Sequence, residues 1–316
     1  MQVSSPSVTN SSPETAGAIL DDFESRPGSA TSLVRTVLGA YVRDLGGSFT
    51  IADFVSWMNA LEISPESTRI AVTRLKKKGI VRPCVRDGRA GYEITEQASA
   101  MFGRGDGRIF GFRRMADGDR WRLISFTIPE SQRAARHQLR RRLTGIGCGT
   151  VAPGLWIAPE YLAAEAVDIV RALELSEFVT TFSTSEIDFP GSLRDAATQW
   201  WDLSGIADRH RRFLDRCDAL SNRPHPQNAR DAFVRFAPLL DEWRIIPYVD
   251  PGLPPAMTPE NWPGDRAVAE FAAARDRYLE SSRAWLAPGR GRAAGRSGSA
   301  DDGSSLRVRS VETAQE

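Results

Sequence analysis

The sequence predicts an α+β protein, and three patterns along its 316 residues support this fold class. Residues 31–104 combine helical apolar spacing with one short hairpin, which predicts a winged helix-turn-helix domain. Residues 118–188 follow the order strand, helix, strand, strand, helix, strand, which predicts a ferredoxin-like βαββαβ middle domain. Residues 192–287 carry apolar residues at helical spacing, which predicts a helical C-terminal domain.

The central element of the first domain is a helix that is predicted to begin at Pro65. Ser64 is suited to cap it, and Pro65 and Glu66 suit its first turn, because proline lacks an N–H that would be unpaired there and an acid favours the positive end of the helix dipole. Gly79 is expected to end the helix. The residues expected on its buried side are Thr68, Ala71, Val72 and Leu75.

Two predicted helices precede this one, over Ser32–Leu45 and from Thr50 to Leu61, and a hairpin follows it. The hairpin is predicted from an Asp87-Gly88 turn between two β-rich runs, which is a strong hairpin signal. In a winged helix-turn-helix the last of three helices enters the major groove and the hairpin contacts the backbone beside it.

Basic residues concentrate between Ser64 and Tyr92, which contains eight of them and two acids. The chain has three lysines, and all three stand together as Lys76, Lys77 and Lys78. This concentration indicates a polyanionic partner, namely double-stranded DNA. The alternative is a solvated helix face, because basic residues at the end of a helix also complement its dipole.

The expected DNA contacts divide by chemistry. Phosphate contacts are expected from Lys76, Lys77, Lys78 and Arg82. Base-edge contacts are expected from Arg69, Thr73 and Arg74, since arginine grips guanine with two hydrogen bonds and a threonine methyl meets thymine. Arg86 and Arg89 at the hairpin tip are expected to touch backbone or minor groove. For Arg74 an ion pair with Glu66 or Asp53 is the alternative.

The segments 103–107 and 113–120 are rich in glycine and charge and are expected to join the first two domains. In the middle domain, strands are predicted at 121–128, 149–152, 155–158 and 178–184, with helices at 129–143 and 159–173. The first of these helices is crowded with arginine, either as a solvated face or to contact phosphates of DNA or of a ligand. Its arginines are Arg133, Arg136, Arg140, Arg141 and Arg142.

In the C-terminal domain, apolar stripes contain Trp200, Trp201 and Trp243, and His210 is interpreted as a packed histidine. Pro238 is a candidate bend, and a last helix is predicted over Asp265–Leu286. Residues 1–30 and 288–316 are rich in small and polar residues and are expected to be disordered.

Several classes of protein are disfavoured. The cysteines Cys84, Cys148 and Cys217 are too far apart to suggest a disulfide framework or a zinc site, which fits the cytoplasm. No apolar run reaches the roughly 18 residues of a membrane span, and no signal peptide is recognisable. No nucleophile triad, phosphate loop or carboxylate pair predicts catalysis, so no catalytic residue, metal ligand or cofactor is expected.

An ordered set of motifs runs from Leu33 to Leu286. It comprises Ser67–Leu75, Tyr92–Thr95, Trp121–Glu130, Gly154–Pro159, Asp250–Pro254 and Asn261–Gly264. In this order the motifs resemble the PaaX family of bacterial transcriptional repressors. The resemblance implies a homodimer on a palindromic operator of an aromatic or acyl-CoA catabolic operon, released by an acyl-CoA thioester such as phenylacetyl-CoA.

For such an effector, we expect phosphate contacts from Arg133, Arg136 and Arg140, and an apolar cleft that contains Trp200, Trp201 and Trp243. One alternative is an architectural DNA-binding dimer without a ligand. Another is a metal-dependent nuclease, since the middle domain also resembles the small nucleases of CRISPR spacer acquisition. Those enzymes place an acid near the end of the first strand, whereas here no carboxylate follows Ser125 until Glu130. We therefore expect no enzyme activity.

Overall fold

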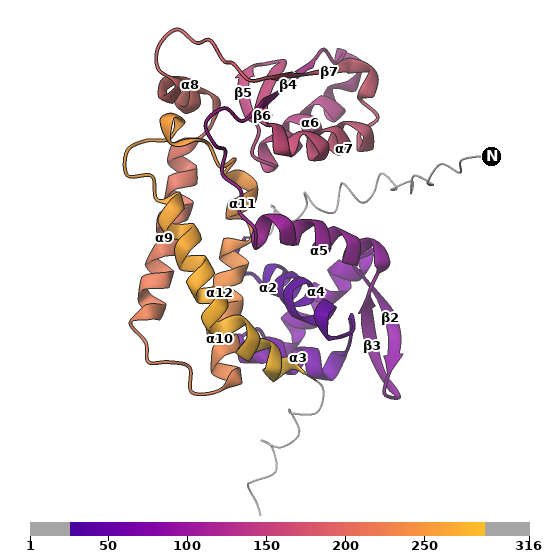
Figure 1. Cartoon of the computed structure of the whole chain (residues 1–316). Coiled ribbons are helices and arrows are strands. Elements are labelled where there is room, and N and C mark those ends of the chain that lie inside the picture. Colours follow the sequence, from indigo (N-terminus) through magenta and orange to yellow (C-terminus); the bar gives the residue numbers. More distant parts are fainter. Residues whose placement is uncertain (1–25, 288–316) are drawn as a thin grey trace, which may run out of the picture.

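The computed structural model describes residues 26–287. The ends expected to be disordered, residues 1–30 and 288–316, fall outside this range except for residues 26–30, which lead through a turn into the first helix. The described part is α+β, with helices throughout and two antiparallel sheets. Figure 1 shows the larger sheet at one end of the molecule and the N-terminal helices with their hairpin at the other.

The N-terminal part contains four helices and a small sheet within the described residues. The helices are α2 (Ala30–Val37), α3 (Ile51–Ala60), α4 (Pro65–Lys77) and α5 (Glu96–Ile109). The strands β1 (Ser48–Thr50), β2 (Val81–Arg86) and β3 (Arg89–Ile94) form an antiparallel sheet in the order β1-β3-β2. The predicted positions of the three helices and the hairpin are confirmed.

The first predicted helix changes its winding along its length. After α2 the chain makes a π-helical turn at Leu38–Val42 and a 3-10 turn at Arg43–Leu45, and Gly46, with a φ of 95°, ends the helical run. A Cβ at Gly39 would lie 3.0 Å from the Phe102 ring, so the absence of a side chain allows the π-helical turn to approach α5. Single π-helical turns inside α-helices are frequent at functional sites.

Helix α5 occupies a segment where the sequence predicts a joint between domains. It passes through Gly103, Gly105 and Gly107, where a joint between domains is expected, and continues to Ile109. At Gly105 a Cβ would lie 2.9 Å from the Tyr248 hydroxyl, so glycine allows close packing there. Arg108 then bonds the carboxylate of Glu165 at 2.8 Å and the carbonyl of Pro247 at 2.9 Å. The helix is therefore held by tertiary contacts that outweigh the low helix propensity of glycine.

The middle part contains the larger sheet. Its elements are β4 (Trp121–Phe126), α6 (Arg133–Gly145), β5 (Gly149–Ala152), β6 (Leu155–Pro159), α7 (Ala163–Ala172) and β7 (Val179–Thr184). The strands are antiparallel in the order β5-β6-β4-β7, and Trp121 of β4 pairs with Pro159 on one side and Thr184 on the other. Both helices contribute to one core beneath the sheet, through Leu139 and Leu143 of α6 and Ile169 of α7. The predicted sequence of elements is confirmed.

The C-terminal part is helical. Its helices are α8 (Leu193–Trp200), α9 (Leu203–Ser221), α10 (Ala229–Trp243), α11 (Ile246–Val249) and α12 (Gly264–Leu286). Pro238 lies inside α10 without ending the helix. In Figure 1, α9, α10 and α12 run side by side next to the N-terminal helices. Across residues 26–287, no helix combines the length and the apolar character that crossing a membrane requires.

The largest hydrophobic core joins the two ends of the described chain. It contains Val37, Phe54 and Leu75 from the N-terminal part together with Phe236 and Phe271 from the C-terminal helices. A second core lies between the larger sheet and its helices, and a third surrounds Trp121 and Trp201. The N-terminal helices are thus packed directly against α10 and α12. The apolar faces of the two groups of helices are buried against each other in one shared core.

Candidate nucleic-acid interface

Local interactions explain where α4 begins and ends. The Ser64 hydroxyl accepts a hydrogen bond from the Ser67 N–H at 3.1 Å, and Pro65 occupies the first turn. The helix ends at Lys78, and Gly79 follows with a φ of 69°. The side packed against the core carries the predicted buried residues Thr68, Ala71, Val72 and Leu75. The opposite side of α4 is therefore turned outward by the same periodicity.

This outer side carries basic residues. Arg69, Thr73, Arg74, Lys76 and Lys77 are all exposed, as is the following Lys78. The Thr73 hydroxyl donates to the Arg69 carbonyl at 2.9 Å, which holds the side chain against the helix. Within residues 26–287, no ion pair is formed by Arg69, Arg74, Lys76 or Lys77, so the alternative that Arg74 pairs with Glu66 or Asp53 is wrong. Four cations on one helix face produce a strongly positive surface.

The hairpin that follows α4 is tightly closed. Asp87 and Gly88 have φ values of 51° and 71°. Positive φ at both central residues is typical of a type I′ turn, whose twist matches that of the two strands. Arg89 is exposed at this tip. Cross-strand pairing joins Arg86 to Arg89 and aligns Cys84 with Gly91, so the register is regular along the hairpin.

Two of the predicted DNA contacts on the hairpin have other partners. Arg86 is turned inward, with 24% of its side chain exposed, and donates a hydrogen bond to the Ser48 carbonyl. The expectation that Arg86 points from the tip toward DNA is therefore wrong, because its guanidinium ties β2 to β1. Arg82 forms an ion pair with Glu93 at 2.6 Å, and this hydrogen bond raises the pKa of Arg82. Arg82 remains largely exposed at the surface.

Two exposed apolar residues next to these cations are missed by the sequence reasoning. Ile70 on α4 is 47% exposed and Val85 on β2 is 77% exposed. Ile70 follows Arg69 and lies one helical turn before Arg74, so the spacing alone assigns it to the outer side. An exposed large apolar side chain beside arginine and threonine suits contact with a thymine methyl group.

The expected effector cleft is not formed. Trp243 is fully buried in the largest core, with its indole N–H bonded to the Ile109 carbonyl at 2.8 Å. Trp201 is buried in the third core and bonds the Gly147 carbonyl at 2.9 Å, with Trp200 packed against the same cluster. The three tryptophans are thus divided between two cores and the prediction that they line one cleft is wrong. Buried indole N–H groups normally find such a partner, which marks these residues as structural.

The arginines of α6 have separate contacts. Arg136 donates to the Glu130 carboxylate at 2.7 Å, and Arg140 donates to the Pro153 carbonyl at 2.7 Å. Arg133 lies 3.8 Å from Glu130 in an exposed pair. Glu130 is the carboxylate nearest in sequence to the end of β4 and is engaged by these arginines. Within the described residues, no three histidine, cysteine or acidic side chains are grouped as metal binding requires.

Comparisons with known proteins match most of the chain. The model described as PaaX-like protein matches residues 29–98, that of the PaaX protein central Cas2-like domain residues 114–196, and that of the PaaX-like protein C-terminal domain residues 201–288. The chain is 22% identical over 256 residues to the protein named transcriptional repressor PaaX of Escherichia coli strain K12, covering 76% of this chain and 78% of that protein.

An uncharacterized protein from Mycobacterium tuberculosis is similar in structure, with a TM-score of 0.49 and 21% sequence identity. The match covers 78% of this chain and 97% of that protein.

Proposed function

Because this chain belongs to the PaaX-like protein family, we propose that it is a DNA-binding transcriptional repressor that reads its operator with α4. The protein that it resembles in Escherichia coli carries the name of a transcriptional repressor, and neither name describes an enzyme. The single observation that carries the proposal is the row of exposed, unpaired cations Arg69, Arg74, Lys76 and Lys77 on the outer side of α4. A duplex of regularly spaced phosphates is the partner that complements such a row.

The order of helices and strands along the chain supports this assignment. Helices α2, α3 and α4 followed by the β2–β3 hairpin support the inference of a winged helix-turn-helix domain over residues 31–104. The sheet order β5-β6-β4-β7 with two helices supports the inference of a ferredoxin-like domain over residues 118–188, and helices α8 to α12 support that of a helical domain over residues 192–287. In this reading α4 enters the major groove while the hairpin follows the adjacent backbone.

The contacts follow from chemistry and exposure. Arg69, Thr73 and Arg74 read base edges, since they lie in the middle of the outer side of α4. Phosphates are bound by the cations at the end of α4 and on the hairpin, which are Lys76, Lys77, Lys78, Arg82 and Arg89. Arg82 also keeps its ion pair with Glu93, which orients the guanidinium along the hairpin surface.

The repressor acts as a homodimer on a palindromic operator of aromatic or acyl-CoA catabolic genes. An acyl-CoA thioester, such as phenylacetyl-CoA, releases it from DNA. An effector of this kind works only if it binds the DNA-competent and DNA-incompetent forms with different affinity.

DNA retardation tests the proposal. The purified full chain is titrated onto the DNA upstream of its own gene and onto a scrambled duplex of equal length, with and without a panel of aryl and alkyl acyl-CoA thioesters. We expect specific retention that one thioester reverses. Equal retention of both duplexes would contradict a sequence-specific repressor, and specific retention that no thioester changes would support the ligand-independent alternative.

A further inference from the structure

Two hollows lie on either side of Ile245, at the end of α10. One is a cavity of about 60 Å³ between α2 and α5 on one side and α10 and α11 on the other. The second is a groove of about 390 Å³ bordered by α6, α9 and α11. Ile245 lines both hollows, so the two approach each other at this residue.

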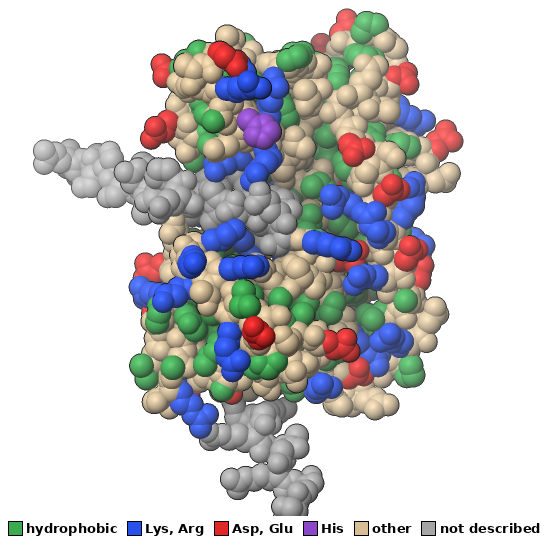
Figure 2. Space-filling model, turned by 180° about the vertical axis from the view of Figure 1, so that it is seen from behind, with side chains coloured by type: hydrophobic (Ala, Val, Ile, Leu, Met, Phe, Trp, Pro, Cys, Tyr) green, Lys and Arg blue, Asp and Glu red, His purple; other side chains and the backbone are tan. Residues whose placement is uncertain are grey.

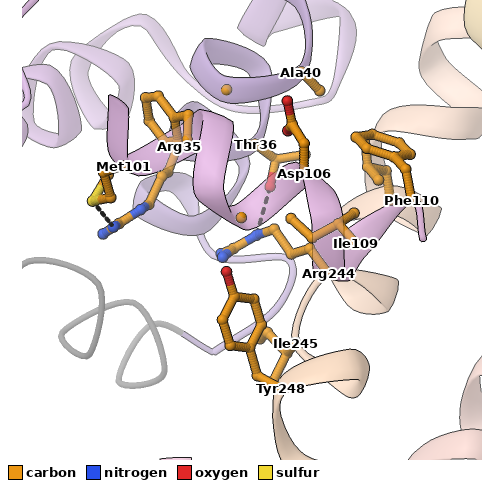
Figure 3. Close-up of a pocket in the computed structure, with 14 residues that line it drawn as sticks. Arg35, Thr36, Ala40, Met101, Asp106, Ile109, Phe110, Arg244, Ile245 and Tyr248 are labelled. Atoms are coloured by element: carbon orange, nitrogen blue, oxygen red, sulfur yellow. Dashed lines mark hydrogen bonds between the residues drawn. The ribbon is translucent and has the colours of Figure 1, made fainter. Parts of the chain in front are cut away.

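The cavity is mostly apolar and has cationic groups on its wall. Met101, Ile109 and Phe110 of the N-terminal part face Leu240 across it. Figure 3 shows the Arg244 guanidinium and the Tyr248 hydroxyl pointing into the same space. Arg35, which is 5% exposed, donates to the Met101 sulfur at 3.6 Å at the cavity wall.

The groove has a different chemistry. Its polar border consists of His137, Arg140 and Arg141 from α6 and Arg209 from α9, and its apolar border includes Ile245 and Val249. None of the residues lining it is acidic. Figure 2 shows basic side chains gathered around a histidine on this face of the molecule. Within the described residues Arg209 is exposed and forms no ion pair, which leaves it available to an anion.

We propose that the groove and the cavity form one site for a ligand that joins a phosphate-bearing head to a small apolar group. The head binds His137, Arg140, Arg141 and Arg209, and the apolar group passes Ile245 into the cavity beside Arg244 and Tyr248. The assignment rests on the proposed function, for which it supplies the place where an acyl-CoA thioester acts. It replaces the tryptophan cleft expected from the sequence.

The small size of the cavity links ligand binding to a change in helix packing. An engineered cavity of about 150 Å³ binds benzene, so about 60 Å³ is too small for a ring. A ring therefore enters only if the helices on the two walls separate. One wall is built by α2, which packs on α4, and the other by α10. A ligand that fills the cavity thus favours a form in which α4 is placed differently relative to the rest of the molecule.

The site is tested by titration calorimetry on the full chain with phenylacetyl-CoA, CoA and phenylacetate as probes. We expect CoA to bind through the groove and phenylacetyl-CoA to bind more tightly. Arg209→Ala should weaken both by roughly tenfold, because a charge-assisted hydrogen bond to phosphate is removed. Arg212→Ala is the matched control, since Arg212 is exposed on the same helix and does not line the groove. It should leave both affinities unchanged.

The cavity is tested separately with Ala40→Leu, which fills it from the π-helical turn. This variant should bind CoA normally and bind phenylacetyl-CoA no more tightly than CoA. If Ala40→Leu fails to fold, hydrogen exchange on the wild-type protein gives a second measurement. Amides of α2 and α5 should then exchange faster with phenylacetyl-CoA than with CoA.

The outcomes of these experiments distinguish failure of the proposed ligand site from failure of the repressor assignment. Tight thioester binding that neither Arg209→Ala nor Ala40→Leu alters would overturn the site and leave the repressor assignment intact. Absence of binding by all three probes would also overturn the site, whereas DNA retardation decides the function independently. Binding of an inorganic phosphate probe as tight as that of CoA would reduce the groove to an anion site and remove the cavity from the proposal.

Discussion

The Asp241 carboxylate of α10 lies 2.6 Å from the Thr36 hydroxyl of α2, although 205 positions separate the two residues. The same carboxylate accepts hydrogen bonds from Ser32 at 2.7 Å and from the Gly28 N–H at 2.7 Å, and Arg244 completes the network at 3.1 Å. Asp241 is fully buried. A single acid therefore fastens the first helix of the N-terminal part, α2, to the C-terminal helices, next to the cavity that Arg244 lines.

Removing this acid should destabilise the protein strongly. Asp241→Ala leaves the buried Arg244 without its carboxylate, and breaking a buried pair from one side costs about 3–5 kcal/mol of unfolding free energy. Denaturant unfolding measures the change. The matched control is Asp241→Ala combined with Arg244→Met, which removes both charges and should recover part of the loss. A loss below about 1 kcal/mol for the single variant would show that the network does not hold the parts together.

The lysine cluster should act on all DNA alike. Replacing Lys76, Lys77 and Lys78 by alanine should lower affinity for specific and scrambled duplexes and flatten the dependence of log K on log salt by about 0.9 per lost phosphate contact. The control removes three exposed arginines on other helices, Arg171, Arg211 and Arg212, so that the net charge changes equally. An unchanged salt slope in the lysine variant would exclude these residues from the interface.

Arg69 should control how strongly the protein discriminates between base pairs at one position of the operator. Arg69→Ala is expected to reduce preference at one base pair by about 1–3 kcal/mol, because a bidentate contact to guanine is lost. The measurement compares binding to the operator with binding to a set of single-base variants. If every duplex weakens by the same factor, Arg69 contacts phosphate and not a base.

Ile70 should contribute to DNA binding without contributing to stability. Since it is 47% exposed, Ile70→Ala should change the unfolding free energy by less than about 0.5 kcal/mol. Affinity for the operator should fall, and replacing the contacted thymine by uracil, which lacks the methyl group, should weaken the wild-type protein in the same way. In Ile70→Ala the uracil substitution should then have no further effect. An additive loss would place Ile70 away from that methyl group.

Arg86 and Arg89, on either side of the hairpin turn, should respond differently to substitution by alanine. Arg89 is exposed, so Arg89→Ala should reduce the salt slope of DNA binding by about one phosphate contact. Arg86 bonds the Ser48 carbonyl, so Arg86→Ala should lower the unfolding free energy by about 1–3 kcal/mol. Thermal unfolding and DNA titration of both variants test this difference. A loss of salt dependence in Arg86→Ala with unchanged stability would restore the tip role expected from the sequence.

Local patterns predicted the elements that depend on near neighbours. The start of α4 at Pro65 follows from the Ser64 cap and its end from Gly79, and the hairpin follows from Asp87-Gly88. The exposed row on α4 follows from the 3.6-residue period together with the apolar stripe that ends in Leu75. These features involve residues a few positions apart, so the amino-acid sequence alone determined them.

Tertiary packing decided the rest, because side-chain partners far apart in sequence are chosen by how the elements meet. The inward turn of Arg86, the separation of Trp201 from Trp243, and the continuation of α5 through Gly105 all depend on such contacts. The bond between Asp241 and Thr36 and the hollows on either side of Ile245 arise where α2 and α5 pack on α10. No period or cap near these residues indicates which distant surface they face.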